Sequence, residues 1–154
     1  MDISWMLKEF GELTPYELYA IVQLRNEVFV VEQNCVFQDA DDKDQESYHL
    51  MGFQHNKLVA YTRIVPAGVS YKEVSIGRVV TSPSVRRGGA GKLLMQKSID
   101  TAYSLFGNVP IKIGAQFYLK KFYESLGFQQ ISDIYLEDGI DHIYMLKPPS
   151  SIIV

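Results

Sequence analysis

The chain has 154 residues, of which 47% are hydrophobic and 21% are charged, as expected for a globular domain with one core. Its net charge of −3 argues against a duplex-binding protein, which usually carries a basic patch. No apolar run approaches the ~18 residues of a membrane span, and the single cysteine, Cys35, excludes an intramolecular disulfide and suits a reducing cytoplasm.

The first predicted elements are a strand over residues 5–10 and a helix that begins after Thr14. Thr14 is the expected N-cap, Pro15 occupies a position where its missing N–H does no harm, and Glu17 completes a capping box. Apolar residues then recur at mostly helical spacing, so we expect the helix to end near residues 33–34. No basic region followed by an apolar segment opens the chain, so no signal peptide is expected.

A polar stretch over residues 38–46 contains four aspartates. An EF-hand calcium loop needs Gly at its sixth position and Glu at its twelfth, where this chain has Asp44 and Leu50. We interpret the stretch as a solvated loop or as an acidic lip of an acceptor site.

The rest of the chain alternates strands and helices. Strands are predicted over residues 47–54, 58–65, 74–81, 109–115, 128–136 and 142–145, and helices over 90–105 and 117–126. This order predicts an α/β (α+β) single domain over residues 1–147, with a mixed sheet of about six to seven strands and helices on both faces. Residues 148–154 are expected to form a short tail.

A glycine-rich loop, Arg86-Arg87-Gly88-Gly89-Ala90-Gly91, lies between a predicted strand and an apolar helix. Amides at a helix start lack intrahelical partners and carry partial positive charge, so they bind phosphate groups. The loop does not match a mononucleotide P-loop, because Gly91-Lys92 is followed by Leu93, and it lacks the G-x-G-x-x-G of dinucleotide folds.

The loop does match R-x-x-G-x-G, and this resembles the acyl-CoA signature of the GNAT acetyltransferase superfamily. Residues 116–128 resemble a second motif of that family, with Tyr123, Gly127 and Phe128 in register. Residues 24–35, 115–116 with 122–125, and 136–140 with His142 are most similar to its ElaA-type subfamily.

This resemblance implies acetyl-CoA as cofactor, a GNAT-like fold and a sheet splayed at the cofactor arm. The pantetheine arm is expected on strand 74–81 and the diphosphate on the loop. The implied cofactor-binding residues are Val79, Val80, Thr81, Arg86, Arg87, Gly88, Gly89, Ala90, Gly91, Lys92, Gln116 and Tyr123. Two positions depart from the usual family pattern at this site, since Thr81 replaces a hydrophobic residue and Gln116 replaces an Asn.

The resemblance also implies direct transfer of an acetyl group to a primary amine in a ternary complex. Tyr123 is then the acid that protonates the leaving thiolate, because an unperturbed tyrosine pKa near ~10 lies close to that of a thiol. Glu32 is the first choice for the base that takes the proton of the amine, with Arg25 as its ion partner or as a ligand of an acidic acceptor. The expected acceptor-binding residues are Arg25, Glu27, Glu32, Asp138 and His142.

No metal site is predicted, because His49, His55 and His142 lack zinc spacing with one another and with Cys35. Cys35 has no sequence neighbour that would activate it, which disfavours an acyl-cysteine route. The expected partner is a small-molecule or peptide amine, with no nucleic acid and no membrane, and the protein is expected to be a monomer or homodimer.

Two alternatives stay open at this point. One is a non-catalytic module that senses acyl-CoA or binds another protein. The other is an acyl-homoserine-lactone synthase, because residues 25–29 are distantly similar to autoinducer synthases.

Overall fold

Eight strands form one mixed sheet in the order β1-β2-β3-β4-β5-β8-β6, and β7 pairs with β8 beside β6. The computed structural model describes residues 2–150. All neighbouring strands are antiparallel except β4 and β5, which run parallel. The strands are β1 (Ser4–Glu9), β2 (Tyr48–Gln54), β3 (Lys57–Val65), β4 (Val74–Thr81), β5 (Ile111–Gln116), β6 (Gln129–Gln130), β7 (Tyr135–Glu137) and β8 (Ile140–Lys147).

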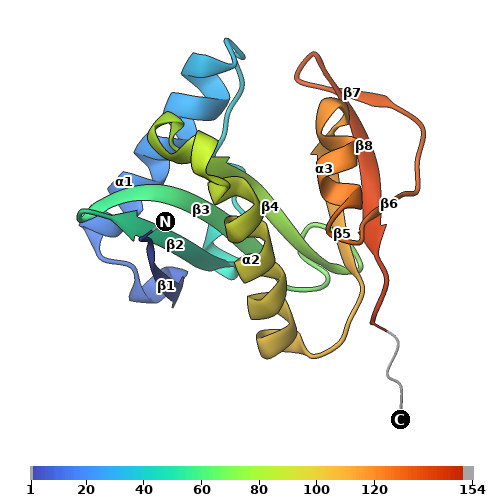
Figure 1. Cartoon of the computed structure of the whole chain (residues 1–154), viewed down its shortest axis with the longest axis horizontal. Helices are drawn as coiled ribbons and strands as arrows, with labels where there is room; N and C mark the ends of the chain where they lie inside the picture. The colour runs from blue at the N-terminus through green and yellow to red at the C-terminus, as the bar shows by residue number, and fades with distance from the viewer. Residues whose placement is uncertain (1, 151–154) are drawn as a thin grey trace.

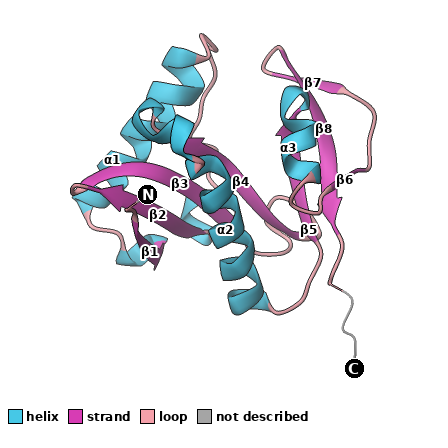
Figure 2. Cartoon of the chain, in the orientation of Figure 1, coloured by secondary structure: helices cyan, strands magenta, loops and turns pink. Residues whose placement is uncertain are grey.

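Three α-helices cover this sheet (Figure 2). They are α1 (Pro15–Arg25), α2 (Ala90–Phe106) and α3 (Lys120–Glu124). Short helical segments join them: the 3-10 turns η1 (Phe10–Glu12), η3 (Asp44–Glu46), η4 (Pro83–Gly88) and η5 (Phe117–Leu119), and the π-helix η2 (Asn26–Glu32) that continues α1. None of the helices in the described part of the chain is both long and apolar enough to cross a membrane.

The predicted capping box at the start of α1 is confirmed. The N–H of Glu17 donates to Thr14 Oγ1 at 3.1 Å, and the N–H of Thr14 donates to Glu17 Oε1 at 2.9 Å. After Arg25 the helix changes to π-helical winding, which the spacing of apolar residues does not predict. The π-helix extends the helical segment to Glu32, close to the end predicted near residues 33–34.

The two faces of the sheet have separate cores, which confirms the prediction of helices on both faces. Along β3, Ala60 and Ile64 pack into the cluster that contains the buried residues of α2, while Tyr61 packs with Ile21 of α1. The alternation follows from the two-residue period of a strand. Helix α3 adds Tyr123 to the α2 side, so α2 and α3 share one face and α1 covers the other.

The sheet opens between β4 and β5. The two strands pair at Val74 with Ile111 and at Ser75 with Lys112, and no further pair joins them within residues 2–150. In Figure 1 they lie together at their lower ends and diverge upward, with α2 crossing in front. The edge of β4 from Ile76 to Thr81 therefore faces β5 without a strand partner.

A β-bulge interrupts β4 at Arg78 and Val79, opposite Thr62 of β3. Arg78 adopts a φ of 50°, which is unusual for a residue other than glycine. Ile76 faces the α2 core, and strict alternation would place Val80 there as well. Val80 instead lies in the α1 core, because the extra residue reverses which face each later side chain occupies.

Two sequence predictions about local structure were wrong. The strand expected over residues 128–136 is divided into β6 and β7, and the sheet has eight strands instead of six to seven. The chain leaves the ladder between them because the Ser132 hydroxyl accepts the N–H of Tyr144, a backbone donor on β8. Of the predicted tail, residues 151–154 lie outside the described part of the chain.

Candidate functional site

A cavity of about 820 Å³ lies where β4 and β5 separate. It extends from the start of α2 and from α3 to the aspartate-rich segment and the turn between β7 and β8. The predicted site residues that line it are Val79, Val80, Thr81, Arg86, Gly91, Gln116, Tyr123, Glu32, Asp138 and His142. The predicted residues that do not line it are Arg25, Glu27, Arg87, Gly88, Gly89, Ala90 and Lys92.

The glycine-rich loop presents the start of a 17-residue helix to one end of this cavity. Gly89 is the N-cap residue and has a φ of 80°, a left-handed conformation that a side chain would strain. A Cβ added to Gly91 would meet nothing closer than the Phe122 ring at 4.0 Å. The open backbone and the positive end of the helix dipole fit a diphosphate group.

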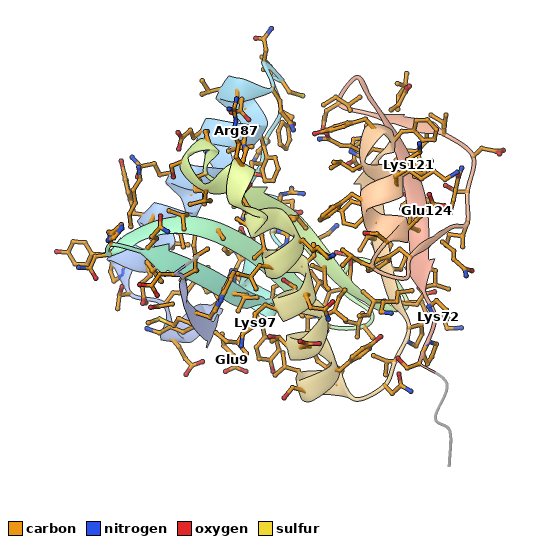
Figure 3. The ribbon with its side chains drawn as sticks, viewed as in Figure 1. Glu9, Lys72, Arg87, Lys97, Lys121 and Glu124 are labelled. Carbon is orange, nitrogen blue, oxygen red and sulfur yellow. The ribbon has the colours of Figure 1, made fainter. Side chains whose placement is uncertain are left out.

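The two arginines of the loop differ in their surroundings. Arg86 lines the cavity, donates hydrogen bonds to the carbonyl of Thr81 at 3.2 and 3.3 Å, and pairs with Glu32 at 2.7 Å. Arg87 is exposed on the turn before α2, across the gap from Lys121 of α3 (Figure 3). The expectation that Arg25 is the ion partner of Glu32 is wrong, because Arg86 takes that place.

Tyr123 is held at the cavity wall by aromatic neighbours. Its ring makes edge contacts with Phe122 at 5.1 Å and with Phe128 at 5.9 Å between ring centroids. Burial, with a smaller contribution from Tyr118, raises the pKa of Tyr123 above its ordinary value. The hydroxyl is therefore protonated at neutral pH. It makes no hydrogen bond to another described residue, so it is free to donate one to a ligand.

Two hydrogen bonds cross the opening between the halves of the sheet. The side-chain amide of Gln116 donates to Gln33 Oε1 at 3.3 Å, and the thiol of Cys35 donates to the carbonyl of Asp138 at 3.3 Å. These contacts connect the segment after η2 to the ends of β5 and β7, so that segment closes one side of the cavity.

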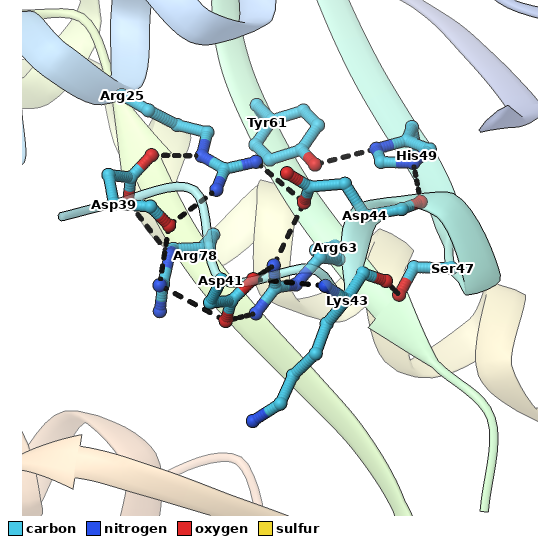
Figure 4. A network of polar contacts seen from close by, with 10 residues as sticks. All are labelled: Arg25, Asp39, Asp41, Lys43, Asp44, Ser47, His49, Tyr61, Arg63 and Arg78. Atoms are coloured by element: carbon cyan, nitrogen blue, oxygen red, sulfur yellow. Dashed lines mark hydrogen bonds and ion pairs between the residues drawn. The ribbon is translucent and has the colours of Figure 1, made fainter. Parts of the chain in front are cut away.

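The other end of the cavity is bordered by a network of three arginines and three aspartates (Figure 4). Arg25 is 1% exposed and pairs with Asp39 at 2.7 Å and Asp44 at 2.8 Å. Arg63 holds Asp41 with two hydrogen bonds of 2.7 and 2.8 Å. This fork-to-fork arrangement fixes the orientation of both groups.

Arg78, the residue of the β4 bulge, belongs to the same network. Its Nε lies 2.8 Å from Asp39 Oδ1, its Nη2 donates to the Asp39 carbonyl at 2.9 Å, and it lies 3.3 Å from Asp41. The aspartates thus hold the strained bulge in place. Of the two interpretations of this stretch, the solvated loop is wrong, because arginines from α1, β3 and β4 converge on the aspartates. The acidic lip of an acceptor site stays a prediction, and Asp41 borders the cavity. Sequence spacing does not show this convergence.

The charges within the network depend on one another. Burial alone would raise the pKa of Asp41, but the hydrogen bond and charge of Arg63 lower it well below its usual range. The pKa of Asp44 is lowered in the same way by Arg25 and Arg63, against the effect of burial. Burial lowers the pKa of His49, whose ring contacts Tyr61 Oη at 2.7 Å and the Asp44 carbonyl at 2.9 Å.

His142 of β8 lies at the cavity wall on the opposite side of the opening. Its Nδ1 is 2.7 Å from the Ile140 carbonyl, and its Nε2 is 3.4 Å from Glu137 Oε2. The ring of Tyr135 stacks on it with a centroid separation of 5.8 Å and an interplanar angle of 29°. His142 is therefore oriented by three neighbouring groups while it remains part of the cavity lining.

Sequence reasoning missed two arginines that line the cavity, Arg63 and Arg78. One sequence signal could have indicated Arg63, because it is a charged residue in the middle of a mostly apolar strand. A buried arginine needs an acidic partner, so the signal predicts an ion pair there. Predicted residue Glu27 lies in a separate, smaller hollow beside α1 and the β2–β3 turn. Within residues 2–150, no group of three or more His, Cys, Asp or Glu residues is arranged to hold a metal ion.

Comparisons with known proteins agree with this geometry. A family model described as an acetyltransferase (GNAT) domain matches residues 17–148. Protein ElaA of Escherichia coli (strain K12) is 41% identical over 147 residues, which cover 94% of this chain and 96% of that protein. The crystal structure of Escherichia coli ElaA superposes with a TM-score of 0.89 at 40% identity, covering 95% of this chain and 99% of the other.

Two further solved structures extend the comparison. An acyl-CoA N-acyltransferase from Pseudomonas aeruginosa has a TM-score of 0.91 at 39% identity, with 95% of this chain and 99% of that chain covered. An aminoglycoside 6'-N-acetyltransferase complexed with coenzyme A has a TM-score of 0.70 at 16% identity, with 97% and 99% covered, and at that identity it supports the fold alone.

Proposed function

This chain belongs to the GNAT acetyltransferase family, and on that premise we propose that it is an N-acetyltransferase that uses acetyl-CoA. In this proposal a primary amine attacks the acetyl thioester directly, with both substrates bound in the cavity. The reaction forms an amide and releases coenzyme A as its thiol. The lone Cys35, with no disulfide partner, is the basis for proposing a cytoplasmic location.

The observation that carries the proposal is the unpartnered edge of β4 beside the start of α2. Backbone groups near Val79, Val80 and Thr81 would pair with the amides of a pantetheine arm, as an added strand does. Amides from Gly89 to Lys92 would hold the diphosphate, and Gln116 would lie along the arm. Both regions border one cavity, so a single extended ligand reaches from the helix start to the bulge.

Binding in this position requires one rearrangement of the protein. The guanidinium of Arg86 donates hydrogen bonds to the Thr81 carbonyl, which would otherwise be free to accept from a pantetheine amide. Arg86 would therefore move toward the diphosphate, leave both the Thr81 carbonyl and the Glu32 carboxylate, and find charged acceptors in the phosphate groups. Hydrogen bonds to charged groups are worth about 1.5–3 kcal/mol, more than neutral ones.

Acetyl transfer needs stabilisation of the developing oxyanion and a proton for the leaving thiolate. We propose that a backbone N–H beside Val80 supplies the first, because the edge of β4 toward β5 has no strand partner there within the described residues. Tyr123 supplies the proton, since it lines the cavity, its hydroxyl is protonated at neutral pH, and that hydroxyl has no competing partner among the described residues.

Arg25 is not part of the proposed acceptor site, because its guanidinium is buried in the aspartate network and does not border the cavity. Asp138 and His142 border the cavity and stay candidates for contact with the amine. The acceptor is proposed to be a small-molecule or peptide amine, and nothing in the proposal requires more than a monomer or a homodimer.

The direct test is thiol release from acetyl-CoA across a library of primary amines, combined with mass spectrometry of the products. Transfer to at least one amine supports the proposal. Binding of coenzyme A without turnover on any amine would favour a sensing module instead, and a homoserine-lactone product would favour the synthase alternative.

A further inference from the structure

The proposed transfer needs a base for the proton of the amine, and Glu32, the carboxylate expected from the sequence, pairs with Arg86 until the coenzyme binds. Glu32 pairs with Arg86 at 2.7 Å, and about 40% of its side chain is exposed to solvent. A suitable base should border the cavity with a lone pair that no cation occupies.

His142 meets this requirement through its hydrogen bonds. The carbonyl of Ile140 can only accept, so the contact of 2.7 Å requires a proton on Nδ1. A neutral ring held in this way has its lone pair on Nε2. The side chain is 9% exposed, and its contact with the Tyr135 ring restricts ring rotation.

The atom nearest to that lone pair is also an acceptor. Glu137 Oε2 lies 3.4 Å from His142 Nε2, so two acceptors lie close together with no donor between them. A protonated primary amine has three N–H donors and positive charge, so it can contact both atoms at once. The pair thus has the chemistry of a subsite for an alkylammonium group at the wall of the cavity.

We propose that His142 is the catalytic base of the acetyl transfer and that Glu137 is the carboxylate that binds the ammonium group beside it; this inference rests on the proposed function. The ammonium gives one proton to His142 Nε2, and the neutral amine nitrogen forms the C–N bond as the C–S bond breaks. The thiolate takes the Tyr123 proton, the tyrosinate takes the second proton that the nitrogen loses as the amide forms, and His142 returns its proton to water. Glu137 faces the N–H formed at Nε2 and so stabilises the imidazolium, whereas the carboxylate of a hydrolytic triad contacts the other ring nitrogen.

The first test is independent of the acceptor. Nitrogen-15 NMR of the whole protein, with histidine labelled, reports the protonation of each ring nitrogen. The signals of His142 are assigned by their loss in His142→Gln. We expect Nδ1 protonated and Nε2 unprotonated at pH 8. Protonation of Nε2 at that pH would overturn the proposal.

The second test compares two amine probes of similar size. Propylamine is an ammonium at neutral pH, whereas 2,2,2-trifluoroethylamine is unprotonated there because its CF₃ group withdraws electrons. His142→Gln should lower kcat/KM for propylamine by roughly 10²-fold or more, which is the usual contribution of a general base. The loss for trifluoroethylamine should be at least tenfold smaller, and the Kd of coenzyme A should stay within about twofold of wild type.

Two further variants complete the experiment. Glu137→Gln should raise the KM of propylamine more than that of trifluoroethylamine, since only the first carries a charge for Glu137 to attract. His55→Gln, on the exposed β2–β3 turn, is the matched control and should retain wild-type rates with both probes.

Three outcomes count against the inference. Equal losses with both probes in His142→Gln would indicate a merely structural residue, and wild-type rates in that variant would overturn the inference alone. A wild-type protein that releases no thiol with any primary amine would overturn the proposed function and this inference together.

Discussion

The two ends of the cavity are built in different ways. At the α2 end, a short continuous segment presents backbone amides and glycines, and the surroundings of Gly89 and Gly91 are open. At the other end, Arg25, Arg63 and Arg78 come from three separate elements and meet aspartates of a single loop. The first end is suited to a ligand that supplies the charge, whereas the second is already neutralised by its own side chains.

The largest effect on stability should come from removing an arginine from the network of arginines and aspartates. Replacing Arg25 by Met removes a shared partner from the buried Asp39 and the half-buried Asp44, each of which keeps one other arginine. Removing one member of a buried ion pair typically costs about 3–5 kcal/mol. We expect a loss of that size in the free energy of unfolding, measured by chemical denaturation.

The matched control is the half-buried ion pair between Lys8 and Glu17 near the surface, whose atoms lie 2.8 Å apart. Lys8→Met should cost no more than about 1 kcal/mol, as is usual for pairs near the surface. Equal costs in the two variants would show that the network adds no stability beyond an ordinary surface pair.

Next in size is the effect of removing the proposed acid. Tyr123→Phe should lower kcat by about 10²-fold, the low end for general acid catalysis, while the Kd of coenzyme A stays nearly unchanged. Tyr103→Phe on α2 is the control, because that hydroxyl lies outside the cavity lining and has no hydrogen-bond partner within residues 2–150. Full turnover in Tyr123→Phe would exclude Tyr123 as the acid.

The network should also make the protein sensitive to acid. The pKa values of Asp41 and Asp44 are lowered in the folded state, so their contribution to stability is present above their unfolded pKa near ~4 and is lost as the pH falls below it. The pKa of His49 is lowered by burial, so its contribution begins to decline below about pH 6.5.

We therefore expect a loss of about 1–2 kcal/mol between pH 5 and pH 3, after allowance for solvent screening at these partly exposed groups. Asp41→Asn lacks one of the titrating carboxylates and should lose less over that interval. Denaturation curves at fixed ionic strength measure this loss in the wild-type protein and in Asp41→Asn. An equal loss of stability in the two proteins would mean that Asp41 does not contribute to the sensitivity to acid.

The smallest expected difference is between the two arginines of the loop. Arg86→Ala should weaken coenzyme A binding by about tenfold, equivalent to one charge-assisted hydrogen bond. Arg87→Ala should weaken it by less than about threefold, because this exposed side chain does not line the cavity. Titration calorimetry at two salt concentrations would measure both losses, and a larger loss for Arg87 would reverse the assignment.

The contrast between the two ends also explains what the sequence could predict. The capping box at Thr14, the strand 74–81 and the helix that follows the glycines depend on neighbouring residues, and all were confirmed. The bulge at Arg78 depends on Asp39, which is 39 residues away in the chain, so local spacing carries no sign of it. The same applies to the orientation of His142, because an amphipathic pattern predicts a strand without showing which side chains meet.

The central claim is that the opening between β4 and β5, together with the first turn of α2, binds acetyl-CoA. Titration calorimetry of the whole chain with acetyl-CoA tests it most directly. We expect one molecule bound per chain, with binding abolished by a bulky replacement such as Gly91→Trp in a variant that still folds. An absence of binding to the wild-type protein would contradict the account.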